Sequence, residues 1–186
     1  MPYKEFTDEN AALLLKALFG VNEDSNITTE AIPEWQLYNV LAIPKDVADW
    51  IRNRFSSAKY VSQCAVSIKS ANTANAGGSM LVDFRTDDFS VMVTNQSKLL
   101  LAQTFSYSTP DDVVYYLLKV CQQFSLAQQE VQINLSGLID KQSALYKELY
   151  QYFINVQFRE AAWSIPDNEY PAHFFTSLND LARCAS

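Results

Sequence analysis

The clearest pattern of hydrophobic and polar positions begins at residue 80. Residues 80–84 are apolar except for Asp83, residues 89–94 alternate, and residues 99–107 form a third, mostly apolar run. The short polar segments 85–88 and 95–98 separate these runs and are typical of tight turns. The pattern therefore predicts a meander of three antiparallel strands.

A helix is predicted directly after the meander. Thr109 supplies a side-chain cap, Pro110 occupies the first helical position, and Asp112 lies three residues after the cap. The wide apolar stripe that follows indicates deep burial. The later elements expected are, in chain order, a strand at 131–135 that ends at Ser136 and Gly137, a helix that opens at Asp140, a strand around Val156 and Phe158, and a helix from Pro171 with Phe174, Phe175, Leu178 and Leu181 facing inward.

The pattern before residue 70 is less regular. Thr7 caps a first helix, and Gly20, which tolerates a left-handed backbone, ends it. The polar residues 21–30 predict a loop. The other elements expected here are a strand at 35–43 covered on both sides, a helix at 44–55, and a short strand at 58–61 that leads into a further helix. The first helix is expected to carry Leu14, Leu15, Leu18 and Phe19 on one face.

A small and polar segment separates the two halves. Residues 70–79 consist of serine, alanine, asparagine, threonine and glycine, a composition typical of linkers. The expected organisation is therefore a first unit at 1–70, a linker at 71–79 and a second unit at 80–186.

Composition narrows the function classes. Of 186 residues, 48% are hydrophobic and 19% are charged, which predicts a folded chain. The net charge of −7 repels phosphate backbones and anionic headgroups, so neither nucleic acid nor a membrane is expected as a partner. Only four glycines are present, which argues against a glycine-rich phosphate loop. Three widely spaced cysteines and the absence of a signal-peptide pattern favour the cytoplasm.

The order of the expected elements points to a fold. Three antiparallel strands followed by helix, strand, helix, strand and helix are the order of a ribonuclease-H-like α/β unit. The segment before the linker reads as the later part of a second such unit without its opening meander. Two units of this kind packed side by side make the actin-like ATPase architecture, and the first unit of this chain is expected to be partial.

Aromatic and hydrophobic placement carries a family resemblance. The segments concerned are Asp83 with Phe84, residues 101–107, residues 112–118, residues 134–137 and residues 171–175. The stretch 82–158 resembles an uncharacterised bacterial family, a domain of unknown function whose members have an actin-like ATPase fold. The resemblance extends back to Pro2 and Tyr3. It implies longer N-termini, so that this chain would lack the first meander and Met1 would be an internal or misassigned start.

The resemblance implies a nucleotide site at the ends of the strands. Actin-like ATPases need an aspartate and flanking glycines at the meander turn, and a glycine pair after the fourth strand. Asp83, Ser136 and Gly137 are the residues that match, and we take them as candidate cofactor-binding residues. Residues 85–88 contain no glycine, and Leu138 replaces the second glycine. The sequence therefore predicts a degenerate site, with no catalytic residue, metal ligand or cofactor assigned.

Two other hypotheses of an enzymatic function have less support in the sequence. A ribonuclease-H-like nuclease would need carboxylates on the first strand, the first helix and the fourth strand, where Asp83, Asp112 and Asn134 stand. Asn134 is not an acid. His173 is the only histidine available to a nucleophilic mechanism, and its place at a helix start favours a structural hydrogen bond.

Interaction is the function that the sequence favours. Tyrosines gather in the second half, and tyrosine-rich surfaces often mark protein interfaces. An unpaired sheet edge in the first unit would invite a homodimer. We therefore expect a non-catalytic cytoplasmic scaffold on a degenerate actin-like ATPase fold, with an ATP-binding conformational switch or weak ATPase as the alternative.

Overall fold

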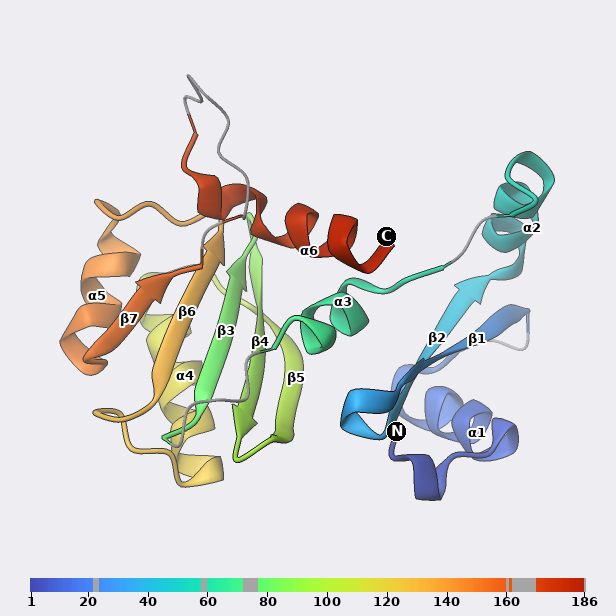
Figure 1. Cartoon of the computed structure of the whole chain (residues 1–186), viewed down its shortest axis with the longest axis horizontal. Coiled ribbons are helices and arrows are strands. Elements are labelled where there is room, and N and C mark those ends of the chain that lie inside the picture. The colour runs from blue at the N-terminus through green and yellow to red at the C-terminus, as the bar shows by residue number, and fades with distance from the viewer. Residues whose placement is uncertain (22–23, 58–59, 72–76, 160, 162–169, 186) are drawn as a thin grey trace. The chain divides into compact units, whose positions relative to one another are not determined.

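The computed structural model describes residues 1–21, 24–57, 60–71, 77–159, 161 and 170–185 (Figure 1). The contacts divide the chain into two compact units, Met1–Ala65 and Val66–Ser186. The predicted linker at 71–79 falls mainly on residues outside the described part, and its boundaries stay a prediction.

The second unit is built on a five-stranded mixed sheet. Its strands are β3 (Ser79–Phe84), β4 (Asp88–Asn95), β5 (Lys98–Ser106), β6 (Gln132–Gly137) and β7 (Asn155–Phe158). The strand order is β5-β4-β3-β6-β7. The first three strands pair antiparallel, whereas β6 runs parallel to β3 and β7 runs parallel to β6. The predicted meander is confirmed, and the two later strands extend it as the ribonuclease-H-like order requires.

Helices cover this sheet on both sides (Figure 1). Buried residues of α4 (Pro110–Phe124) and α5 (Ala144–Tyr152) join those of the strands in one hydrophobic core. A short 3-10 helix, η3 (Ala172–Phe175), and α6 (Thr176–Ala185) contact β6 from the opposite side. One face of the sheet is therefore buried, and Leu81 and Asp83 on the other face of β3 are half-buried.

The start of α4 is as predicted, and the start of α5 is not. The Thr109 side chain accepts from the Asp112 amide, and the Asp112 carboxylate accepts from the Thr109 amide, which completes a capping box. α5 begins at Ala144 with Ser143 as its cap, whereas Asp140 was expected to open it. Asp140 instead accepts from the Gln142 amide in the preceding turn.

In the last helix, α6, the buried face is not the predicted one but the face opposite to it. Leu178 is 57% exposed and Leu181 is 43% exposed, although both were expected to face inward. The buried residues are polar: His173, Thr176, Asn179 and Asp180. Two contacts account for this orientation, because Arg159 forms an ion pair with Asp180, and the Thr176 hydroxyl donates to the Arg159 carbonyl.

The first unit consists of a hairpin and short helices. Its elements are η1 (Tyr3–Glu5), α1 (Asp8–Phe19), β1 (Ser25–Ile32), η2 (Pro33–Trp35), β2 (Leu37–Pro44) and α2 (Lys45–Arg54), and α3 (Gln63–Lys69) begins in this unit and ends in the next. β1 pairs antiparallel with β2 along its whole length. Thr7 caps α1, and Gly20 ends it at a φ of 62°, both as predicted.

Several expectations for this unit are wrong. The predicted loop at 21–30 contains most of β1, whose side chains alternate between more and less exposed positions. β2 is half-buried and not covered on both sides. In α1 only Ala11 is buried, and Leu14, Leu18 and Phe19 are exposed. Of the strand expected at 58–61, residues 58 and 59 lie outside the described part, and residues 60 and 61 are not in a strand.

Every helix among the described residues is too short or too polar to cross a bilayer.

Candidate functional site

The three candidate site residues lie together at the ends of two parallel strands. In the register of β3 and β6, Asp83 lies opposite Ser136, and Phe84 lies opposite Gly137. The Ser136 hydroxyl donates a hydrogen bond of 2.7 Å to Oδ1 of Asp83. Ligands in open α/β sheets bind at the carboxyl ends of parallel strands, so the cluster occupies the position where a ligand is expected.

Contact between the strands explains why residue 137 is a glycine. Its φ is 78°, a value that side chains with a Cβ rarely adopt. A Cβ added here would lie 2.2 Å from the carbonyl oxygen and 2.8 Å from the amide nitrogen of Phe84. The space beside Gly137 is therefore filled by the backbone of β3, and no ligand is needed to account for the residue.

The residues after Gly137 continue this contact with β3. The Leu138 amide donates to the Phe84 carbonyl at 2.8 Å, while the Leu138 side chain is 55% exposed. Ile139 is buried, and its carbonyl lies 2.7 Å from Nε2 of His173. An exposed apolar side chain thus follows Gly137, at the position where the resemblance implied a second glycine.

The β3–β4 turn is closed by its own groups. Arg85 forms an ion pair with Asp88, and the Arg85 amide donates to the Asp88 carbonyl at 2.9 Å. The Tyr107 hydroxyl donates to the Arg85 carbonyl at 3.1 Å. Burial raises the pKa of this hydroxyl, and the nearby carboxylates of Asp87 and Asp88 raise it further. The turn therefore presents acidic side chains, and the amide and carbonyl of Arg85 are already hydrogen-bonded within the protein.

The carboxylate set of a nuclease does not form here. The side chain of Asn134, at the fourth-strand position, donates to Ser79 Oγ at 3.0 Å and accepts from Nε2 of Gln157 at 2.6 Å. Asp112 caps α4, and hydrogen bonds from the Ser108 and Thr109 amides lower the pKa of its carboxyl group. Among the described residues, no group of three His, Cys, Asp or Glu side chains is placed to hold a metal ion.

His173 has a structural place in the interior. Its ring stacks on Phe158 with centroids 4.1 Å apart, and its Nε2 makes the bond to Ile139 noted above. The side chain is 6% exposed. The sequence favoured this role for His173, and the contacts agree with it.

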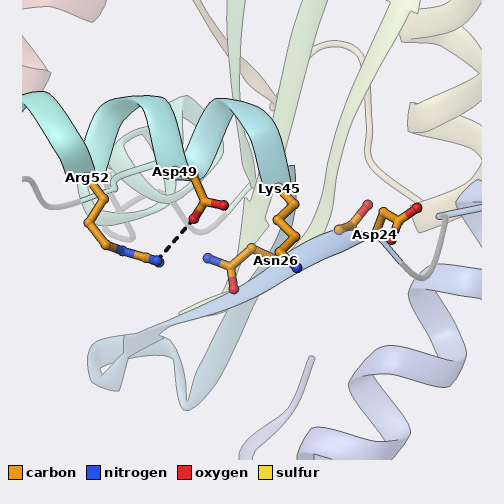
Figure 2. A pocket seen from close by; sticks show the side chains of 6 residues that line it. Asp24, Asn26, Lys45, Asp49 and Arg52 are labelled. Atoms are coloured by element: carbon orange, nitrogen blue, oxygen red, sulfur yellow. Dashed lines mark hydrogen bonds and ion pairs between the residues drawn. The ribbon is translucent and has the colours of Figure 1, made fainter.

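A polar hollow in the first unit was not foreseen from the sequence. It has a volume of about 260 Å³ and lies between the start of β1 and the face of α2 that carries Lys45, Asp49 and Arg52 (Figure 2). Its lining residues are Asp24, Ser25, Asn26, Lys45, Asp49 and Arg52. Arg52 and Asp49 form an ion pair with 3.2 Å between their charged atoms. The lining as a whole holds two acidic and two basic residues, so the hollow has no net charge to attract an ion. The hollow depends on β1, which the sequence pattern presented as a loop.

The strand order β5-β4-β3-β6-β7, with β6 parallel to β3, belongs to an actin-like ATPase fold. A solved Bacteroides thetaiotaomicron protein, described as having this fold and an unknown function, aligns with a TM-score of 0.79 at 22% identity. The alignment covers 99% of this chain and 68% of that protein. The chain belongs to the family described as protein of unknown function DUF3822, whose model matches residues 1–156.

One further solved structure is much less similar. An AlfA filament bound to AMPPNP aligns with a TM-score of 0.42 at 14% identity, over 66% of this chain and 42% of that one. No curated protein matches the chain. The comparisons therefore establish the family and the fold, and the family carries no assigned activity.

Proposed function

We propose that this chain is a non-catalytic interaction module, a cytoplasmic scaffold on a degenerate actin-like ATPase fold. The observation that carries the proposal is the approach of Gly137 to the Phe84 backbone, with 2.2 Å between the Phe84 oxygen and the position of a Cβ. Gly137 could have let a nucleotide approach the backbone, but here it lets β6 pack closely against β3. Leu138 then adds an exposed apolar side chain at the same edge.

Electrostatics at the meander turn supports the same proposal. Phosphate sites in proteins are formed by backbone amides and cations that converge on the anion. Here Asp83 accepts from Ser136, Arg85 is paired with Asp88, and Asp87 is exposed. A triphosphate would therefore meet carboxylates, which repel it unless a cation intervenes.

Exposed apolar side chains support an interaction role. Tyr115, Tyr150 and Tyr170 are each at least half exposed, and so is Leu138. Exposed aromatic side chains provide large contact area with a polar tip, which is the composition of interface anchors.

Thermal melting with and without Mg-ATP tests the proposal. A nucleotide present at 100 times its Kd would stabilise the fold by about 2.7 kcal/mol. For a chain of this size that corresponds to a rise in Tm of roughly 5–10 °C. We expect no shift at millimolar Mg-ATP. A rise of several degrees that disappears in Asp83→Ala would overturn the proposal, and that variant separates binding at this cluster from binding elsewhere.

The alternative is a nucleotide-dependent conformational switch. It is supported by the placement of Asp83 and Ser136 side by side at the carboxyl ends of β3 and β6. A switch requires that nucleotide bind one conformation better than another. Small-angle scattering of the chain with and without Mg-ATP would then differ, whereas the scaffold proposal expects identical profiles.

A further inference from the structure

We infer that the outer edge of β5 is a self-association surface, on which a second copy of this chain adds its own β5 to continue the sheet. The inference rests on the proposed interaction role and names its partner. β5 forms one edge of the sheet (Figure 1), and among the described strands it pairs only with β4.

From Leu101 to Ser106 this edge lacks the features that keep sheet edges from pairing, because Lys98 and the bulge at Leu100 both precede that segment. Proteins blunt exposed edges with charged residues, proline or very short strands. β5 is nine residues long, and residues 99–107 contain no charged residue and no proline. Ala102, Gln103 and Thr104, at its middle, are exposed. The centre of the strand is therefore open on both faces of the sheet.

A bulge limits the regular part of the edge to one segment. Val93 lies opposite Leu101 and Thr94 opposite Leu99, so Leu100 has no partner on β4. From Leu101 to Ser106 the pairing with β4 is regular. At about 3.4 Å per residue, this segment presents roughly 20 Å of edge to a second strand.

The regular segment is complementary to itself. A two-fold axis normal to the sheet and centred on Gln103 would pair the strands antiparallel with both cores on the same side. Leu101 would then lie opposite Phe105 of the second copy, Ala102 opposite Thr104, and Gln103 opposite its own equivalent. Leu101 and Phe105 form an apolar pair, the small residues Ala102 and Thr104 fit opposite each other, and no like charges meet. A charged peptide, by contrast, would find no charged side chain on residues 101–106 to select it.

Aromatic side chains extend the surface beyond the backbone edge. Phe105 stacks on Tyr116 of α4 with centroids 4.5 Å apart, and Tyr116 contacts Tyr115 at 5.5 Å. Tyr115 is 57% exposed. Because the proposed axis keeps both α4 helices on one side of the joined sheet, these rings would flank the seam in both copies. The predicted tyrosine surface and the strand edge thus form one contact area.

Analytical ultracentrifugation of the full chain at about 1 µM to 1 mM tests the inference, a range chosen because small interfaces give weak dimers. We expect a concentration-dependent dimer for the unsubstituted chain. Gln103→Lys places two ammonium groups opposite each other at the axis and is expected to raise the dimer Kd at least tenfold. Gln123→Lys makes the same substitution at an exposed position of α4 and is expected to leave the Kd unchanged.

Charge reversal distinguishes this pairing from a general loss of stability. Gln103→Glu alone should also be monomeric, whereas an equimolar mixture of Gln103→Lys and Gln103→Glu should recover the dimer. Circular dichroism melts check that each variant is folded. A chain that stays monomeric at 1 mM, or a dimer that Gln103→Lys leaves intact, would overturn the inference. A monomer without an Mg-ATP shift refutes only this inference, whereas an Mg-ATP shift that disappears in Asp83→Ala refutes only the proposed function.

Discussion

Substitution of Gly137 by alanine tests the argument on which the degenerate site depends. The new Cβ would lie 2.2 Å from the Phe84 oxygen, and the residue would keep a φ of 78°. The left-handed backbone costs a residue with a Cβ about 1–2 kcal/mol. Displacement of the β3 backbone adds about 1–3 kcal/mol, the usual range for overpacking. The expected loss in the free energy of unfolding is therefore about 2–5 kcal/mol.

Gly78→Ala is the matched control in the same unit. Gly78 also has a positive φ, of 89°, but a Cβ there would meet the end of the Leu126 side chain at 2.9 Å, which can move aside. Its expected loss is only the backbone term, about 1–2 kcal/mol. Urea unfolding followed by circular dichroism measures both variants. Equal losses would refute the reasoning, because the positive φ alone would then account for Gly137 and the approach of the Phe84 backbone would contribute nothing.

Three further predictions concern charges and thiols in the second unit. Arg159→Ala leaves the Asp180 carboxylate, whose side chain is 4% exposed, without its partner and should lower the free energy of unfolding in urea by about 3–5 kcal/mol. Adding Asp180→Asn should recover part of that loss. Equal losses for the single and the double variant would contradict this prediction. Folding lowers the pKa of Asp112 from 3.8, so the contribution of this carboxylate to the free energy of unfolding is present above pH 3.8 and is lost as pH falls through the folded pKa. Asp112→Asn should therefore reduce the fall in stability at acidic pH, measured by urea unfolding at a series of pH values. An unchanged fall would count against the cap. Burial raises the pKa of Cys121 to about 11, so a thiol reagent at pH 8 should modify it only in urea, as peptide mapping would show, and fast native labelling would contradict its burial.

The second unit was predictable because its signals are local. The polar turns at 85–88 and 95–98 bound runs of the right length, and the Thr109 cap fixes the start of α4 within one residue. Such signals act within a few residues and need no knowledge of the rest of the fold. The parallel pairing of β3 with β6 then follows from connection rules, and it brings Asp83 to Ser136.

The errors arose where distant contacts decide the structure. β1 has the sequence SNITTEAI, in which polar residues obscure the alternation, and only its pairing with β2 defines it as a strand. In α6 the leucines indicated the buried face, yet the Arg159–Asp180 ion pair turns the polar face inward. Arg159 comes 21 residues before Asp180, so no helical periodicity could have revealed that partner.

The candidate site shows the same division between local and distant information. Sequence placed Asp83, Ser136 and Gly137 near one another and noted the bulk of Leu138. It could not show that the Ser136 hydroxyl donates to Asp83 or that the Phe84 backbone fills the space beside Gly137. Those two contacts change the interpretation of Gly137. In a sequence, a glycine that lets a phosphate approach the backbone cannot be told from one that lets a neighbouring strand pack closely. The choice between them depends on what lies within 3 Å of the missing Cβ, and here that is the backbone of β3.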